Sequence, residues 1–290
     1  MALRTTTADR VLRALDRSTP ADELADLSTQ RSSEVREAVA LNPATPVAVL
    51  VALAGDRSDD VASTAAHNLS ATREVWDAAL AAGRRWAVAQ VTWLPTEMLD
   101  ELAGDGDAEI RRMVAEATAR PDLVRLLAAD PETAVRVAAA GSDAADLDVL
   151  LSLLADQRRE VRAAAACNDA VPVEHLERLA GDPSADVRWA VVIAHPDKPE
   201  LQRHFLDDAD EDIRDHAREA LERPARRVDR EDGTTDFVRD GDEEDELGWE
   251  EDWDEDDLGP LDAEMDRQRV EAHSRRLALL EATRGGPAAG

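Results

Sequence analysis

The sequence predicts an all-α fold, a solenoid of about eight helix-turn-helix repeats, from a periodic signature and from composition. An apolar residue, mostly followed by arginine, recurs every 24 to 26 residues, and we call it the anchor of its repeat. Repeats of this length cannot bury their apolar faces alone, so neighbours must stack. Aromatic content is only 3%, which favours close-packed helices and predicts no sheet. The anchors are Val35, Val61, Trp86, Ile110, Val135, Val161, Val187 and Ile213.

Each repeat begins with a predicted helix that precedes the anchor. Apolar residues stand eleven and eight positions before most anchors, as at Leu24 and Leu27. A spacing of three places both on one helical face, which we expect to be buried. Prolines precede or open this helix, where a missing N–H costs little. They are Pro46, Pro95, Pro172 and Pro199.

A second helix is predicted around and after each anchor. The third and fourth residues after the anchor are mostly small and apolar, as in Ala38 and Val39, which predicts tight packing. Asparagines stand at the far end of this helix, where we expect a left-handed residue to end it. They are Asn42, Asn68 and Asn168.

Two charged columns accompany the anchors. An aspartate lies five residues before most anchors, as at Asp182, and should cap the second helix. An arginine follows most anchors, as at Arg162. One of each per repeat predicts a structural ladder in which arginine pairs with the aspartate of its own or the next repeat. The alternative is an arginine row that binds an anionic ligand.

The period and the charge divide the chain into four predicted parts. Residues 1–19 form an N-terminal capping helix, and residues 20–224 form the repeats. Residues 225–261 form an acidic disordered linker, because a segment this charged and this poor in apolar residues cannot bury enough surface to order itself. Residues 262–284 form an amphipathic helix with Met265, Val270, Leu277 and Leu280 available to dock.

Charge bears on the class of partner. The net charge is −30: residues 1–228 contribute −15, residues 229–266 contribute −18 (twenty carboxylates against two arginines), and residues 267–290 contribute +3. An acidic array argues against nucleic acid, whose backbone is bound by clustered lysine and arginine. No apolar leader or membrane-length apolar stretch stands in the sequence, and Cys167 is its single cysteine. We therefore expect a cytoplasmic protein that binds neither nucleic acid nor membrane.

The stretch VREAVALNPATPVAVLVALAGDRSDDV, residues 35–61, resembles the leucine-rich repeat variant (LRV) unit through its Val-Arg, Asn-Pro and Leu-x-x-Leu-Ala-x-Asp elements. The whole array, residues 20–222, resembles HEAT-like α-solenoids. The resemblance implies a right-handed superhelical stack whose second element per repeat is a short or 3₁₀ helix, and a protein-binding scaffold as function. One member type of the variant family binds an iron–sulfur cluster through several cysteines; with Cys167 alone, we expect no cofactor here.

Catalytic and metal signals are poor. The six histidines stand in different columns, and no nucleophile elbow or phosphate-binding glycine loop is present in the sequence. Asp208, Asp210, Asp212 and Glu219 are spaced like EF-hand ligands, but Ile213 stands where the loop needs glycine. We therefore expect no catalytic residue, no metal site and no enzyme activity.

One repeat departs from the pattern. Around its anchor, Ala81 and Ala87 replace the expected aspartate and arginine. Three tryptophans also lie close together in the sequence, at Trp76, Trp86 and Trp93. The indoles either fill an irregular core or form a binding pocket. A pocket for a damaged nucleotide, as in HEAT-like DNA glycosylases, is disfavoured by the acidic surface.

Candidate binding residues are the variable ones, at the second and sixth positions after each anchor. These positions share a face opposite the small apolar stripe and should be exposed. Trp189 beside Ile193 is the expected anchor for a partner; the alternative is that Trp189 packs under the C-terminal segment of its own chain. The candidates are Val88, Thr92, Arg112, Glu116, Val137, Cys167, Trp189 and Ile193.

Two further candidates, Trp249 and Trp253, lie four residues apart in the acidic segment. They belong either to a solubilising tail or to a short motif that docks on a basic groove of a partner or on the chain's own arginine row. The sequence as a whole predicts a non-enzymatic scaffold that binds a protein through its variable face, with the acidic tail for steering or autoinhibition. The alternative is an acidic regulator that mimics nucleic acid and binds a basic partner protein. The oligomeric state stays open.

Overall fold

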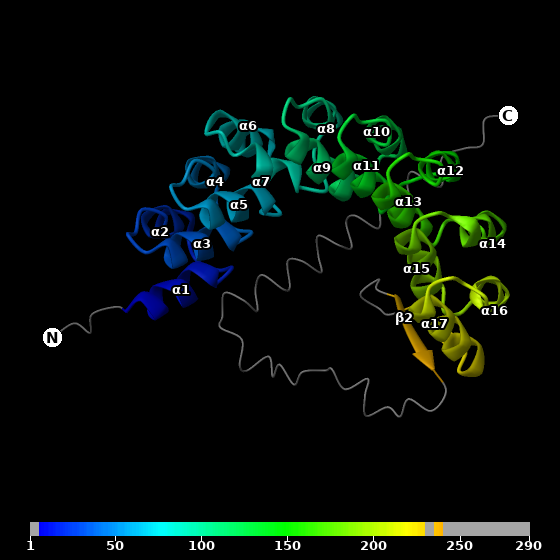
Figure 1. Cartoon of the computed structure of the whole chain (residues 1–290). Coiled ribbons are helices and arrows are strands. Elements are labelled where there is room, and N and C mark those ends of the chain that lie inside the picture. The colour runs from blue at the N-terminus through cyan, green and yellow to red at the C-terminus, as the bar shows by residue number, and fades with distance from the viewer. Residues whose placement is uncertain (1–5, 230–234, 240–290) are drawn as a thin grey trace, which may run out of the picture. The chain divides into compact units, whose positions relative to one another are not determined.

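The computed structural model describes residues 6–229 and 235–239, and these are almost entirely helical. The chain divides into two compact units at Asp105 and Gly106. We call the described residues up to Asp105 unit 1 and those from Gly106 unit 2. The predicted all-α repeat architecture is confirmed in both units (Figure 1).

Unit 1 contains two layers of helices. The first helices of its repeats are α2 (Ala21–Leu27), α4 (Val47–Leu53), α6 (Arg73–Ala81) and α8 (Thr96–Ala103). The other layer contains α1 (Thr7–Leu15), α3 (Ser33–Leu41), α5 (Asp59–His67) and α7 (Arg85–Ala89). Consecutive members of this second layer pack on one another, α1 on α3, α3 on α5 and α5 on α7.

Unit 2 repeats the arrangement. Its first helices are α10 (Pro121–Leu127), α12 (Leu147–Leu153), α14 (Val173–Leu176) and α16 (Pro199–Gln202), the last two continued by 3₁₀ turns η1 (Glu177–Gly181) and η2 (Arg203–Phe205). Its second helices are α9 (Ala108–Ala117), α11 (Thr133–Ala140), α13 (Arg159–Ala166), α15 (Ala185–Ala194) and α17 (Glu211–Glu222), each packed on the next. The resemblance placed 3₁₀ structure in the second element of each repeat; it lies instead in the first element of the last two repeats.

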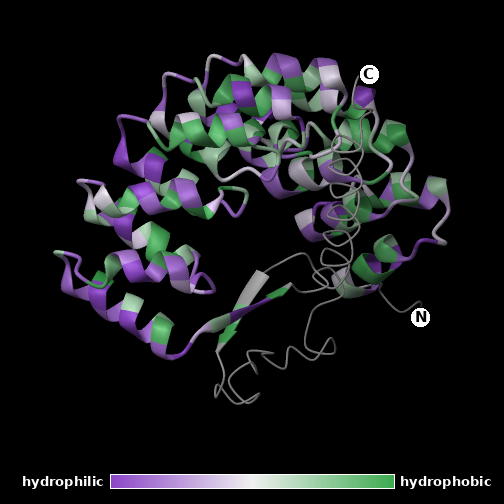
Figure 2. Cartoon of the chain, turned by 90° about the vertical axis from the view of Figure 1, so that its right-hand side faces the viewer, coloured by the Kyte–Doolittle hydropathy of each residue, from purple (hydrophilic) through white to green (hydrophobic). Residues whose placement is uncertain are grey.

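The core of each unit lies between its two layers. The leucines of the first helices and the anchors of the second are buried, as Leu50 and Val61 are in unit 1 and Leu150 and Val161 in unit 2. Small residues such as Ala165 fill the contact between successive second helices. Hydrophobic and hydrophilic residues alternate along the helices (Figure 2), as expected for helices with one buried face.

The arginine and aspartate columns form the predicted ladder. Each arginine pairs with the aspartate of the following repeat through both Nε and Nη2, with Nε–oxygen distances of 2.7–2.8 Å. No side chain in these pairs is more than 14% exposed. We call each pair a rung. The rungs are Arg36–Asp56, Arg111–Asp130, Arg136–Asp156, Arg162–Asp182 and Arg188–Asp208.

Each rung also satisfies the turn between the two helices of a repeat. Arg162 donates from Nη1 to the carbonyl of Asp156 at 2.9 Å, and Asp182 accepts the N–H of Ser184 at 2.9 Å. Ser184, not the aspartate, is the N-cap of α15. The predicted capping role of the aspartates is therefore wrong in detail: they close the turn from two residues before the N-cap and three before the helix begins.

Asparagines join neighbouring repeats. Asn68 donates from Nδ2 to the carbonyls of Ala40 at 2.6 Å and Asn42 at 3.0 Å, and its Oδ1 accepts the N–H of Ser70 at 2.8 Å. The predicted left-handed helix end is wrong, because Asn68 is extended at φ −59° and ψ 135°. No residue other than glycine has positive φ in the described chain. Asparagine serves here as a cross-repeat hydrogen-bonding group.

The irregular repeat lies in unit 1. Of its three tryptophans Trp76 is buried, and its indole N–H donates to the carbonyl of Ala66 at 2.9 Å. Trp86 and Trp93 are half-buried. The reason is that α7 has only five residues, and Val88 with its two alanine neighbours takes the buried positions.

A short β-hairpin follows the helices and corrects the expectation that no strand is present. β1 (Ala225–Asp229) pairs antiparallel with β2 (Thr235–Arg239), so part of the segment 225–261 is ordered. β1 is tied to the repeats because Arg227 pairs with Asp169 at 2.6 Å. The C-terminal helix predicted at 262–284 and the rest of the acidic segment lie outside the described residues.

Candidate functional site

The variable face of the second helices is only partly exposed. Glu116, Cys167, Trp189 and Ile193 are exposed, as predicted. Thr92, Arg112 and Val137 are half-buried. Val88 is completely buried, which contradicts the prediction for that position and follows from the shortness of α7. Trp249 and Trp253 lie outside the described residues.

Arg112 is held within its own helix. Its guanidinium donates to Glu109 at 2.6 Å and also to Glu116, on α9. These carboxylates raise the pKa of Arg112 above its ordinary value. Arg112 and Glu116 therefore neutralise each other.

Trp189 and Ile193 form the exposed apolar patch of unit 2 on this face. They lie one turn apart on α15, and their exposed fractions are 37% and 41%. The indole makes an edge contact with the imidazole of His216 on α17, with ring centroids 5.4 Å apart. A large aromatic side chain is thus held on a helix that is itself fixed by the Arg188–Asp208 rung.

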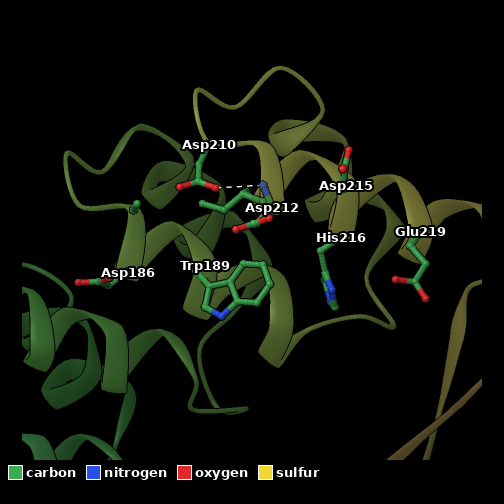
Figure 3. A pocket seen from close by; sticks show the side chains of 9 residues that line it. Asp186, Trp189, Asp210, Asp212, Asp215, His216 and Glu219 are labelled. Carbon is green, nitrogen blue, oxygen red and sulfur yellow. Dashed lines mark hydrogen bonds between the residues drawn. The ribbon is translucent and has the colours of Figure 1, made fainter.

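An open pocket of about 420 Å³ surrounds Trp189, between α15 and α17. Figure 3 shows carboxylates around the indole: Asp210 and Asp212 on one side, Glu219 beyond the imidazole of His216, and Asp186 at the opposite end. The complete lining is Ala185, Asp186, Trp189, Asp210, Asp212, Ile213, Asp215, His216 and Glu219.

The carboxylates of this pocket differ in their partners. Asp186 pairs with Arg159 at 3.1 Å and Asp215 with Arg218 at 2.6 Å, and all four side chains are more than half exposed. Asp212 has no arginine, lysine or histidine partner among residues 6–229 and 235–239, and its backbone N–H donates to Asp210 at 3.0 Å. The pocket is consequently acidic, with one aromatic wall.

A second hollow, of about 320 Å³, lies between the ends of α11 and α13. Gly141, Asp143, Ala164, Cys167, Asn168 and Asp169 line it. Cys167 is exposed as a residue, but protein atoms partly surround its thiol, and this desolvation raises the pKa of the thiol above its ordinary value. A raised pKa keeps the thiol protonated at neutral pH, which disfavours a nucleophilic role.

Sequence analysis found Trp189 and Ile193 but missed most of the pocket. Asp186 and Asp212 stand one residue before their anchors, and His216 stands three after one. We assigned these columns to no surface, although the aspartates recur at the same place in consecutive repeats. That recurrence was the available signal.

The described residues contain no cluster of three or more histidine, cysteine or acidic side chains that could hold a metal ion. No helix among them has the length and apolar character to cross a membrane.

Comparison with known proteins identifies the repeat. Residues 34–58 match the family described as leucine rich repeat variant. Curated proteins give no match.

Three solved structures are similar to the chain. The first is a leucine-rich repeat variant with a novel repetitive structural motif (29% identity, 64% of this chain and 80% of that chain, TM-score 0.44). The second is a designed armadillo repeat protein in complex with the peptide (KR)4 (18% identity, covering 74% of this chain and 98% of that chain, TM-score 0.25). The third is an archaeal HEAT-like repeats protein from Thermococcus onnurineus NA1 (17% identity, covering 74% of this chain and 90% of that chain, TM-score 0.24).

The stacked helix pairs of both units define the chain as a helical-repeat protein, an α-solenoid. Residues 34–58 match the leucine rich repeat variant model, which confirms the sequence resemblance to the LRV unit.

Proposed function

We propose that the chain is a non-enzymatic scaffold that binds a partner protein through the second helices of unit 2. The observation that carries the proposal is the exposure of Trp189 and Ile193 on α15. Large aromatic side chains that lie in pockets on rigid elements supply much of the binding energy at protein interfaces. The partner's contact would cover an apolar patch that otherwise faces water.

The rungs support this role because they make the surface rigid before binding. Arg162–Asp182 links α13 to the turn before α15, and Arg188–Asp208 links α15 to the turn before α17, with no side chain in these pairs more than 14% exposed. A pre-ordered surface loses little conformational entropy when a partner docks. Every arginine in a rung is occupied by its aspartate, which disfavours the alternative of an arginine row for anionic ligands or for the acidic tail.

The chemistry of the pocket favours binding over catalysis. Carboxylates, one indole and one imidazole line it, and no serine, threonine or cysteine is among them. The negative charge disfavours nucleic acid and anionic membrane surfaces as partners. As part of the proposal, residues 229–266 add negative charge that steers a partner toward this face or occupies it competitively, and the protein acts in the cytoplasm.

The test compares Trp189→Ala with Leu126→Ala. Leu126 is the matched control because it is also a large exposed apolar residue of unit 2, but it lies on α10 in the other layer. Full-length protein and both variants are immobilised, and captured proteins are quantified by mass spectrometry. Loss of an anchor worth about 2 kcal/mol or more should weaken capture about 30-fold. Equal capture by Trp189→Ala and wild type would contradict the proposal.

Salt distinguishes the second candidate function, an acidic regulator that mimics nucleic acid for a basic partner. A complex that rests on Trp189 should largely survive half-molar salt, because screening weakens exposed charge pairs far more than apolar contacts. A mimic's complex should dissociate there and should also be lost when residues 229–266 are deleted.

A further inference from the structure

The pocket around Trp189 combines an exposed aromatic side chain with an excess of carboxylates, and this combination restricts what can occupy it. More than a third of the indole surface is exposed, and one neighbour, His216, contacts its edge. The indole N–H of Trp189 has no acceptor within the described part of the chain. A purely apolar occupant would cover Asp212, which has no cationic partner among the described residues, and this N–H without pairing with either, which costs free energy.

From this geometry we infer that the pocket accepts an arginine side chain from an extended segment of the partner protein, with an aliphatic neighbour of that arginine resting on Ile193. The inference rests on the proposed function and adds the chemistry of the partner. The guanidinium lies against the indole and donates to Asp212.

Arginine fits each wall of the pocket. Its planar guanidinium stacks on an aromatic face, and its fork of N–H groups matches a carboxylate. Asp212 offers a carboxylate with no cationic partner among the described residues, and Trp189 lies beside it (Figure 3). The aliphatic stem of arginine covers apolar surface while its head stays at the polar rim.

Two carboxylates at the rim already hold arginines of this chain, and both pairs can be exchanged. Arg159–Asp186 and Arg218–Asp215 are more than half exposed. Exposed pairs of this kind contribute about 0–1 kcal/mol each, so an incoming guanidinium competes at small cost. By contrast, the buried pair Arg188–Asp208 is not available for exchange with an incoming arginine.

Charge excludes the other occupants of similar size. An acidic segment would meet Asp186, Asp212 and Glu219 and be repelled. Lysine can reach the same carboxylates, but its compact ammonium forms no bidentate fork and stacks less well on an indole. We therefore expect arginine to bind more tightly than lysine, and both more tightly than an uncharged analogue.

The experiment uses full-length protein and short synthetic peptides. The probe is acetyl-Ala-Leu-Arg-Leu-Ala-amide, and the matched peptides carry lysine or citrulline in place of arginine. Citrulline keeps the shape of arginine without its charge. Binding is followed by the NMR signal of the Trp189 indole N–H, assigned as the resonance that Trp189→Phe removes.

The arginine peptide should move this signal saturably, and the citrulline peptide should bind about tenfold or more weakly. Asp212→Asn should weaken the arginine peptide about fivefold to tenfold, whereas Asp148→Asn, an exposed carboxylate on α12, should have no effect. Equal binding of the citrulline peptide, or no movement of the signal at millimolar peptide, overturns the inference.

Two further outcomes separate this inference from others. Loss of protein capture in Trp189→Ala without any arginine-peptide binding leaves the scaffold proposal standing and overturns the arginine pocket. The double variant Arg275→Gln, Arg276→Gln tests the chain's own basic segment. If that variant moves the Trp189 signal with no peptide present, the occupant is the chain itself, and the assignment to a partner is wrong.

Discussion

The two units carry the same repeat, but their rungs differ. In unit 2 four successive rungs join its repeats, from Arg111–Asp130 to Arg188–Asp208. In unit 1 the rung Arg36–Asp56 is followed by a gap, because Ala62 and Ala81 occupy the two positions of the next rung. Both members of this rung are missing together, whereas at the following rung position only the arginine is missing, because Ala87 replaces it and Asp105 remains.

Unit 1 uses arginines from other positions at both irregular rungs. Arg84 donates to the carbonyl of Asp56 at 3.0 Å and pairs with Asp59. Arg85 pairs with Asp105 at 3.1 Å, but its side chain is 51% exposed. Exposed pairs contribute less than buried ones. The comparison teaches that the helix-pair architecture does not require every rung, because unit 1 keeps its two layers of helices where regular rungs are missing.

The largest expected effect comes from breaking a rung in unit 2. Asp182→Ala leaves the Arg162 guanidinium without its carboxylate and the Ser184 N–H without its acceptor. We expect the free energy of unfolding to fall by about 2–4 kcal/mol. The measurement is urea denaturation followed by circular dichroism.

The control for this variant is Asp186→Ala, four residues further along the chain. Its pair with Arg159 is more than half exposed, so the loss should be about 0–1 kcal/mol. Equal losses in the two variants would show that burial does not set the value of these pairs, and that the rungs are no stronger than surface ion pairs.

The second prediction concerns the asparagine that joins two repeats of unit 1. Asn68→Ala removes two donated bonds, to the carbonyls of Ala40 and Asn42; the Asn42 carbonyl still accepts the N–H of Thr45, but the Ala40 carbonyl loses its cross-repeat donor. We expect a loss of about 1–3 kcal/mol. Asn168, the equivalent in unit 2, is only half-buried, so Asn168→Ala should cost less. The opposite order, measured by the same denaturation assay, would contradict a role for burial.

The rungs and the asparagine bonds also show why the fold was predictable from the sequence. Period, leucine spacing and the two charged columns each repeat eight or nearly eight times, and repetition averages out local exceptions. What failed was local: α7 is short, so Val88 is buried, and the asparagines bond across repeats in extended conformation. Those outcomes depend on contacts about 26 residues away in sequence, and no single column displays them.

The site was predictable in its centre and not in its rim. Trp189 stood out because a large aromatic residue occupies a column that is otherwise small or polar. Asp212 and His216 join it only because α17 packs on α15, which brings side chains from the next repeat into one pocket. Sequence periodicity defines columns, whereas the pocket crosses from one repeat to the next.

The third prediction restores the missing rung. Ala62→Arg alone should destabilise unit 1, because it buries a charge without a carboxylate beside Arg84. Adding Ala81→Asp should supply the partner and recover about 1–2 kcal/mol of coupling free energy in a double-mutant cycle. Additive effects of the two changes would mean that the gap in unit 1 cannot hold a rung, and that the comparison with unit 2 reflects backbone geometry.

The smallest expected effect is a dependence of stability on pH, which differs between His67 in unit 1 and the rungs. Burial lowers the pKa of His67 on α5, although the carbonyls of Ser63 and Gln90 oppose the shift. His67 therefore binds a proton more readily in the unfolded chain than in the folded one. The free energy of unfolding should fall as the pH drops below about 6.5, by roughly 1 kcal/mol over one pH step. The rungs behave differently: Arg188 holds the pKa of Asp208 below its ordinary value, so the contribution of this rung to stability persists until the pH falls below about 4.

The measurement is denaturation at pH 7.5 and 5.5. The free energy of unfolding should differ less between these two pH values for His67→Gln than for wild type. An unchanged difference would mean that His67 titrates alike in the folded and unfolded chains.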